Sequence, residues 1–202
     1  MPGPREPAVA GLFYPADREE CILEIRRCLA AAAPLVPGGT RAVAAVVPHA
    51  GWIYSGPTMA AALLALAPGE PDTLLLFGAD HHGILGGACA VHSRGAWETP
   101  VGEVGVDEEV AAALIASPGL QVQASEEAHA PEHSLEVILP FLRTLLPRAK
   151  VVPILTPPGV GAARVGEAAA RAARALGRKA VALGSSDLTH YGTRYEIGRA
   201  HV

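Results

Sequence analysis

Short apolar runs of strand length, separated by helical patterns, are the feature that most limits how this chain can fold. Four such runs are almost continuously hydrophobic and end at glycine, proline or polar residues: Ala42–Val47, Thr73–Phe77, Val151–Leu155 and Ala180–Leu183. A strand that is apolar on both faces must be covered on both sides, as in a parallel sheet flanked by helices. The pattern therefore predicts an α/β fold with a mainly parallel central sheet.

Helical periodicity fills the segments between these runs. The predicted helices are Asp17–Ala33, Pro57–Ala67, Asp107–Ala116, Ser134–Leu146 and Gly161–Leu176. Asp17 and Asp107 suit N-cap positions, because a carboxylate accepts hydrogen bonds from the free amides of a first helical turn. Pro140 predicts a kink in the fourth helix. No repeat or linker divides the chain, so we expect a single domain over residues 1–202.

Composition excludes several classes of protein. Half of the 202 residues are hydrophobic and 18% are charged, which is enough apolar surface to fold rather than remain disordered. The net charge is −4, and no basic stretch is interleaved with aromatic residues, so nucleic-acid binding is not expected. The apolar runs are far shorter than the roughly 20 residues of a bilayer span. With three cysteines and no recognisable leader, a cytoplasmic protein without disulfides is expected.

Polar loops that contain histidine follow three of the four apolar runs. His49 follows the first run, His81 and His82 follow the second, and Asp187 and His190 follow the last. In open α/β sheets, ligands bind beyond the carboxyl ends of the strands, so these loops can converge. The sequence therefore predicts a shared histidine site.

Each of these residues also has a structural interpretation. His49 could instead cap the following helix. His81 and His82 are neighbours, and adjacent side chains of an extended segment point to opposite sides, so at most one is expected to be a metal ligand. A carboxylate three residues from an imidazole, as in Asp187 and His190, can fix its tautomer and make it a general base. The alternative is that Asp187 and His190 form an Asp–His pair on the surface without a catalytic role.

The segment from His129 to His133 matches H-x-x-E-H, a reversed zinc-protease pattern. That motif needs both histidines on one helical face. Pro131 favours the first position of a helix, which would leave His129 outside it. We therefore reject the protease interpretation and expect Glu132 and His133 in a first helical turn, facing the site.

The strings around these residues resemble the Memo family, which in bacteria is often called AmmeMemoRadiSam system protein B. The matching strings cover nearly the whole chain, at 5–15, 48–57, 78–82, 97–102, 132–142 and 185–192. The family is similar in fold to class III extradiol ring-cleaving dioxygenases, which use non-haem iron(II). The resemblance implies that His49 and His81 are metal ligands.

The resemblance also implies an acid–base role for His190, supported by Asp187, with Glu132 and His133 lining the same cleft as catalytic residues. Iron(II) comes from the resemblance alone, because imidazole binds iron, copper and zinc alike.

The chain departs from the family pattern at its end. Family members typically run some tens of residues further than Val202, and a cysteine from that later segment can complete the metal site. None of the three cysteines here occupies that position. The third ligand is therefore left open between Asp187, Glu132 and another histidine. A domain shortened in this way is expected to expose an apolar face or strand edge.

Three functions fit these expectations. The first is a metal-dependent oxidoreductase with dioxygenase-like chemistry on a small molecule. The second is a zinc-assisted hydrolase in which His190 or Glu132 is the base. The third is a non-catalytic module whose cleft binds a peptide or protein partner. We place the oxidoreductase first, with no nucleic-acid or membrane partner.

Overall fold

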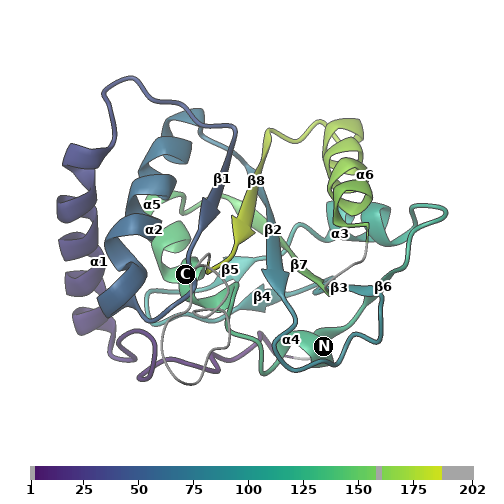
Figure 1. Ribbon diagram of the computed structural model, residues 1–202, viewed down its shortest axis with the longest axis horizontal. Helices are drawn as coiled ribbons and strands as arrows, with labels where there is room; N and C mark the ends of the chain where they lie inside the picture. The colour runs from purple at the N-terminus through teal and green to yellow at the C-terminus, as the bar shows by residue number, and fades with distance from the viewer. Residues whose placement is uncertain (1–2, 158–160, 188–202) are drawn as a thin grey trace, which may run out of the picture.

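A computed structural model describes residues 3–157 and 161–187, and it contains a six-stranded sheet in the order β1-β8-β2-β7-β3-β6 (Figure 1). The strands are β1 (Ala44–Val47), β2 (Thr73–Ala79), β3 (Cys89–Val91), β6 (Val122–Ala124), β7 (Lys150–Thr156) and β8 (Ala180–Ser185). Neighbouring strands are parallel except β3 and β7, which are antiparallel. The predicted α/β fold with a mainly parallel sheet is therefore confirmed.

The four predicted strands are β1, β8, β2 and β7, which lie next to one another and make up four of the six strands of the sheet. β2 and β7 lie next to each other, and most of their residues are buried, as expected for runs that are apolar on both faces. A strand-like apolar stretch before His92 proves to be β3, whereas β6 and a small second sheet of β4 (Ala96–Trp97) and β5 (Val104–Gly105) were not predicted. Strands of two or three residues are too short to show a periodicity.

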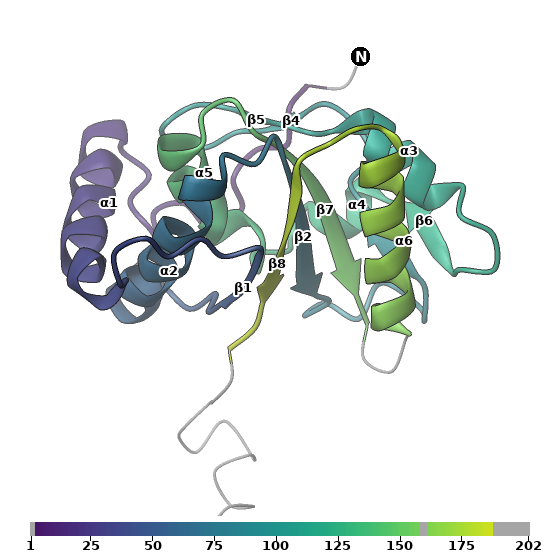
Figure 2. The ribbon, with the colours of Figure 1, turned by 90° about the horizontal axis from the view of Figure 1, so that it is seen from above.

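Helices cover both faces of the sheet (Figure 2). On one side lie α1 (Arg18–Ala32), α2 (Trp52–Leu66) and α5 (Leu139–Leu145), and on the other lie α3 (Glu108–Ile115) and α6 (Ala162–Ala175). Asp17 caps α1 by accepting from the amides of Glu19 and Glu20, and Asp107 caps α3 by accepting from the amide of Val110. Both predicted N-caps are confirmed. Among the described residues, no helix is long and apolar enough to cross a membrane.

The start of α2 was predicted wrongly. The helix begins at Trp52 and continues through Pro57, so the proline does not mark its first turn. Trp52 is 2% exposed and packs against Tyr14 and Phe141, with ring centroids 5.1 and 4.5 Å away. Burial of this large ring fixes the first turn of the helix, although Pro57 removes one backbone hydrogen bond.

The predicted helix Ser134–Leu146 is also wrong in its first part. A 3₁₀ turn, η3 (Glu136–Ile138), precedes α5, and Pro140 lies in the first turn of α5 rather than at a kink. Residues 130–135 are not helical; the preceding short helix is α4 (Glu126–His129). The expected helical turn at Glu132 and His133 is therefore absent, because the Glu132 carboxylate binds the backbone amides of the turn that follows it.

A candidate metal centre of three histidines

His49, His81 and His133 lie together beside the carboxyl ends of β1 and β2. One ring nitrogen of each lies within 4.8 Å of those of the other two. His49 follows β1, His81 follows β2, and His133 comes from the loop between α4 and η3. Their ring centroids are 4.6–5.6 Å apart. These three imidazoles can hold a metal ion.

The three ligand nitrogens, within 4.8 Å of one another, are more widely spaced than a bound metal requires. Nitrogens held at about 2.1 Å from one ion lie roughly 3.0–3.6 Å apart, so the rings must move inward before they can bind it. The His81 side chain is 38% exposed and that of His133 is 19% exposed. Partly exposed rings have room for such a movement, whereas the His49 side chain is almost fully buried.

Glu132 orients His81. Its carboxylate oxygen Oε1 is 2.9 Å from His81 Nδ1, and its Oε2 accepts from the His81 backbone amide at 2.9 Å. Oε1 also accepts from the amides of His133 and Ser134 at 2.8 Å. Burial alone would raise the pKa of Glu132, but these hydrogen bonds outweigh it and lower the pKa to about 2. The ionised carboxylate holds the His81 proton on Nδ1 and leaves Nε2 free to bind a metal.

Ser185 orients His49 in the same way. The Ser185 hydroxyl donates to the carbonyl oxygen of Ser134 at 2.6 Å, so it accepts from His49 Nδ1–H at 3.0 Å. The lone pair of His49 is therefore on Nε2. Burial lowers the pKa of His49, an effect that the Asp187 carboxylate opposes. A lowered pKa favours the neutral imidazole, which is the form that binds metals.

Asp187 lies against His49. Its Oδ1 accepts from the His49 backbone amide at 2.7 Å, and its Oδ2 is 3.8 Å from His49 Nε2. The carboxylate is thus close to the nitrogen that faces the candidate metal position.

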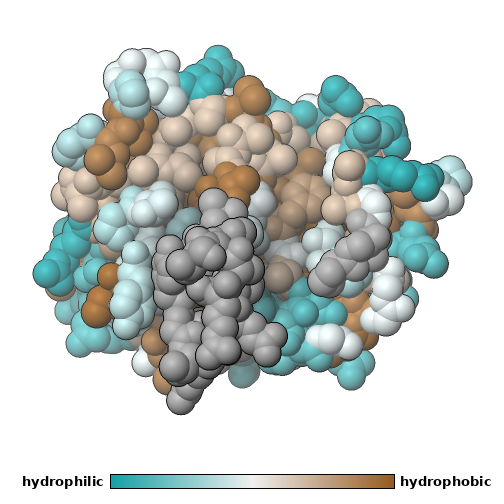
Figure 3. All heavy atoms as spheres, in the orientation of Figure 1, coloured by the Kyte–Doolittle hydropathy of each residue, from teal (hydrophilic) through white to brown (hydrophobic). Residues whose placement is uncertain are grey.

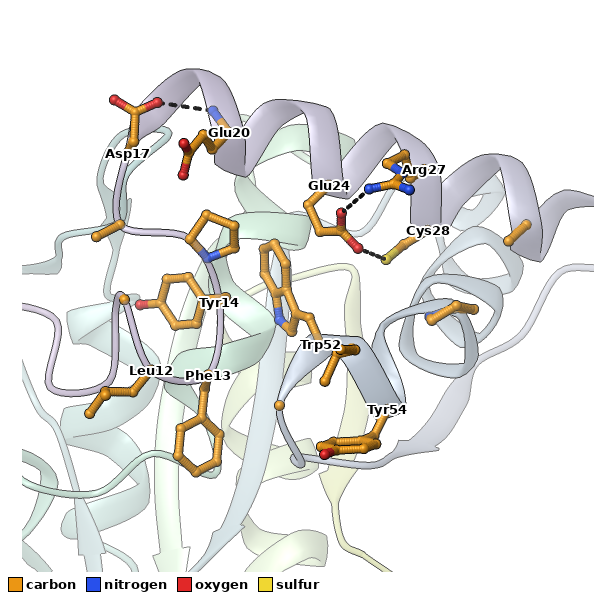
Figure 4. A pocket seen from close by; sticks show the side chains of 17 residues that line it. Leu12, Phe13, Tyr14, Asp17, Glu20, Glu24, Arg27, Cys28, Trp52 and Tyr54 are labelled. Carbon is orange, nitrogen blue, oxygen red and sulfur yellow. Dashed lines mark hydrogen bonds and ion pairs between the residues drawn. The ribbon is translucent and has the colours of Figure 1, made fainter.

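His133 borders an apolar wall. Its ring packs against Phe13 at a centroid distance of 4.8 Å, and burial lowers its pKa. Phe13 also lines a groove of about 980 Å³ between α1, the loop that carries Phe13 and the first turns of α2. Figure 4 shows the aromatic rings of Tyr14, Trp52 and Tyr54 in this groove, with Asp17, Glu20 and Glu24 on the α1 side. The groove therefore adjoins the histidine cluster through Phe13.

A buried ion pair holds the N-terminal segment against the loop that carries Glu132 and His133. Arg5 Nη1 is 2.8 Å from Glu136 Oε2, and Arg5 donates to the carbonyl oxygens of His129, Ala130 and Glu132. Glu136 also accepts from the amide of Ala8, the amide of Val9 and the Tyr14 hydroxyl. Burial raises the pKa of Tyr14, and the Glu136 carboxylate adds to the shift. Arg5 and Glu136 thus support the backbone that places Glu132 and His133.

The structure brings together only part of the predicted site. His49 and His81 lie together, and His133 joins them as a third candidate ligand rather than only lining the cleft. Glu132 contacts His81 instead of presenting a free carboxylate to the cleft. His190 lies outside the described residues.

His82 and His129 both lie outside the cluster of three histidines, and one supporting residue was not predicted. His82 is exposed and contacts the Pro131 carbonyl oxygen, whereas His129 is buried next to His92. Ser185 was not predicted to contact His49. The parallel pairing of β1 with β8 places Ser185 beside Val47, so only the strand order could have revealed this contact.

Comparison with known proteins decides the family. The family model of Memo, described as Memo-like protein, matches residues 5–201. The chain belongs to the Memo family. This confirms the resemblance seen in the sequence, while the expected similarity in fold to extradiol dioxygenases stays a prediction.

Curated Memo-family relatives support the assignment. A MEMO1 family protein of Pyrobaculum arsenaticum is 42% identical over 195 residues, covering 93% of this chain and 69% of the relative. A MEMO1 family protein of Methanopyrus kandleri is 41% identical over 199 residues, covering 93% of this chain and 69% of the relative. A MEMO1 family protein of Aeropyrum pernix is 42% identical over 151 residues, covering 70% of this chain and 52% of the relative. The chain thus spans between about half and about two thirds of the length of these Memo-family relatives.

Proposed function

We propose that this Memo-family protein is a metal-dependent oxidoreductase that binds non-haem iron(II) through His49, His81 and His133 and acts on a small molecule. The observation that carries the proposal is the cluster of three imidazoles, with ligand atoms within 4.8 Å of one another. Three protein ligands leave coordination positions open, as a catalytic metal requires. Bound iron(II) would supply a redox-active centre at which a substrate and dioxygen can meet.

The chain's own residues have distinct roles in this proposal. Glu132 and Ser185 keep the protons of His81 and His49 on Nδ1, away from the metal position. Asp187 places its carboxyl group beside the candidate metal position, with its Oδ2 3.8 Å from His49 Nε2. His190, which the family resemblance pairs with Asp187, moves a proton to or from the substrate. Phe13, packed on His133, keeps water from one side of the cluster.

A zinc-assisted hydrolase is the second candidate, because three histidines are also a common ligand set of catalytic zinc. In that case Asp187 or His190, rather than Glu132, would be the base, since both Glu132 oxygens already accept hydrogen bonds. A third candidate is a non-catalytic module, supported by the groove next to Phe13, in which a peptide or protein partner would bind.

Anaerobic titration of the metal-free protein with iron(II), copper(I) and zinc(II) separates these candidates. We expect about one iron per chain, with binding lost in His49→Ala/His81→Ala and weakened at least tenfold in His133→Ala. His82→Ala is the matched control, because His82 is exposed and outside the cluster. Oxygen uptake by the iron-loaded protein with small phenols then tests the redox chemistry. Binding of zinc alone would favour the hydrolase, and no binding would leave the non-catalytic module.

A further inference from the structure

A second cluster of rings lies away from the metal centre, around Trp97. His92 follows β3, Trp97 belongs to β4, and His129 ends α4. The three ring centroids are 5.4–5.8 Å apart and each pair of rings is close to perpendicular, at 71–81°. His92 is 5% exposed, and Trp97 and His129 are completely buried.

Each of the three rings has a buried nitrogen without a hydrogen-bond partner among the described residues. These atoms are His92 Nδ1, Trp97 Nε1 and His129 Nε2. Buried polar atoms in proteins are nearly always paired, with protein groups or with ordered water. Three unpaired nitrogens on rings in mutual contact therefore indicate that something binds there.

The protons on these rings limit what can bind. His129 Nδ1 lies 2.8 Å from the Ser125 carbonyl oxygen, which can only accept, so Nδ1 carries the proton and Nε2 is an acceptor. Trp97 Nε1 is a donor only. Burial lowers the pKa of His92 and of His129 to about 4, so both are neutral near pH 7. Depending on its tautomer, His92 Nδ1 is either a donor or an acceptor.

A site that combines a fixed donor with a fixed acceptor does not suit an ion. The Trp97 N–H would face a cation unfavourably, and the Arg5 guanidinium carbon, 4.0 Å from the centre of the Trp97 ring, adds positive charge nearby. The His129 lone pair would in turn repel an anion. Water can donate twice and accept twice, so it satisfies all three nitrogens with either tautomer of His92. Buried waters typically make about three hydrogen bonds.

We propose that His92, Trp97 and His129 form a buried binding site for one ordered water molecule. This water accepts from Trp97 Nε1–H, donates to His129 Nε2 and takes His92 Nδ1 as its third partner. The site lies beneath the loop that carries Glu132 and His133, because Arg5 stacks on Trp97 and donates to the carbonyl oxygens of His129 and Glu132, both at 2.8 Å. The water thus helps to hold the first residues of that loop in position.

The two tryptophans of the chain allow a test with an internal control. The Trp52 indole N–H donates to the Val137 carbonyl oxygen at 2.9 Å, whereas that of Trp97 has no protein partner among the described residues. In the ¹⁵N-labelled full chain, we expect the Trp97 indole proton to show a nuclear Overhauser effect to a long-lived water, and the Trp52 indole proton to show none. A high-resolution crystal structure should then show water density within hydrogen-bond distance of all three nitrogens.

The variant His129→Phe removes one water partner while keeping a ring of similar size. We expect the Trp97 water signal to fall at least tenfold, with the Trp52 resonance unchanged as evidence of folding. Absence of the signal in the wild type, together with rings that close on one another without density, would overturn the proposal. If His129→Phe does not fold, the wild-type crystal structure and Overhauser measurement decide the question alone.

Discussion

Glu132 is the residue that joins the two sides of the candidate metal centre. Its carboxylate binds the ring and the backbone amide of His81, and also the amides of His133 and Ser134. It therefore fixes one candidate ligand directly and the backbone of a second. Its side chain is only 1% exposed, so these hydrogen bonds form where water does not compete strongly.

We expect Glu132→Gln to weaken metal binding by about 10- to 100-fold, the usual effect of losing a partner of a metal-binding histidine. The amide keeps the size of the side chain but has only one acceptor oxygen for four donors. The measurement is the affinity for iron(II) and zinc(II) by anaerobic titration. Glu127→Gln, on the exposed side of α4, is the control. An unchanged affinity would show that Glu132 does not support a metal ligand.

Ser185 should affect metal binding, because its hydroxyl sets the tautomer of His49. In Ser185→Ala, His49 Nδ1 loses its acceptor, and the proton is free to move to Nε2. We expect about a tenfold loss of metal affinity, together with a change in the His49 ¹⁵N chemical shifts of the metal-free protein. Ser186→Ala is the neighbouring control, because Ser186 is exposed and, in the described part of the chain, only its backbone amide makes a hydrogen bond. Equal shifts in wild type and variant would contradict the assigned role.

At the scale of elements, the end of β2 meets the turn after His133 very closely. A Cβ atom on Gly78 would lie 2.6 Å from Ser134 Oγ and 2.8 Å from Leu135 Cγ. Leu135 is completely buried and has little space to move. Glycine at this position therefore allows the strand and the loop to pack together, and with them His81 and His133.

We expect Gly78→Ala to lower the free energy of unfolding by about 1–3 kcal/mol, as overpacking of a buried contact does. Urea unfolding measures this change. Gly105→Ala is the control, because a Cβ there meets nothing within 4 Å and the backbone is not in the left-handed region. A Gly78→Ala variant as stable as wild type would mean that the turn at Ser134 and Leu135 shifts without cost.

At the scale of the whole molecule, buried histidines should make stability depend on pH. Burial lowers the pKa of His92 and His129 to about 4, whereas an unfolded histidine has a pKa near 6.5. As the pH falls from 6.5 towards 4, the unfolded chain takes up protons that the folded chain does not, so stability falls. The loss amounts to about 3 kcal/mol per histidine, from 1.36 kcal/mol per pH unit.

Urea unfolding at several pH values between 7 and 4 checks this expectation. The pKa values of His49 and His133 are also lowered by burial, and they act in the same direction. The His129→Phe variant should therefore show a flatter dependence, not a flat one. The carboxylate Glu132 contributes separately at lower pH, between about 4.5 and its folded pKa of about 2. Stability that is constant from pH 7 to pH 4 would contradict the burial of these rings.

The outer edge of β1 is an exposed, apolar strand edge. Among the described residues, β1 pairs only with β8, and Val43 and Val46 are 79% and 61% exposed. Figure 3 shows apolar side chains over α2 and β1 on this face. An exposed apolar edge strand is a site at which chains associate.

We expect this protein to self-associate at micromolar concentrations through β1, and Val46→Lys to reduce the association by placing a charge on the edge. Sedimentation velocity over a concentration series measures the effect. Leu35→Lys is the control, since Leu35 is 67% exposed but lies outside the strands. A wild-type chain that stays monomeric, or a control that acts like Val46→Lys, would contradict an association through the edge of β1.

The sequence by itself determined the four central strands, two helix starts and two of the candidate metal ligands. Continuous apolar runs indicated β1, β2, β7 and β8, because strands covered on both faces need such runs. Asp17 and Asp107 marked helix starts through local hydrogen bonds. The loops after the strands supplied His49 and His81, and the sequence motifs around these residues indicated the Memo family. All of this information is local in the chain.

Only the tertiary structure decided which of these residues meet. Ser185 reaches His49 because β8 lies between β1 and β2. Glu132 and His133 reach His81 because the Glu132 carboxylate replaces the predicted helical turn with a bent loop. His129, four residues from His133 in the chain, instead packs with His92 and Trp97. Such contacts depend on strand order and on the packing of distant segments, and neither is encoded in the spacing of residues along the chain.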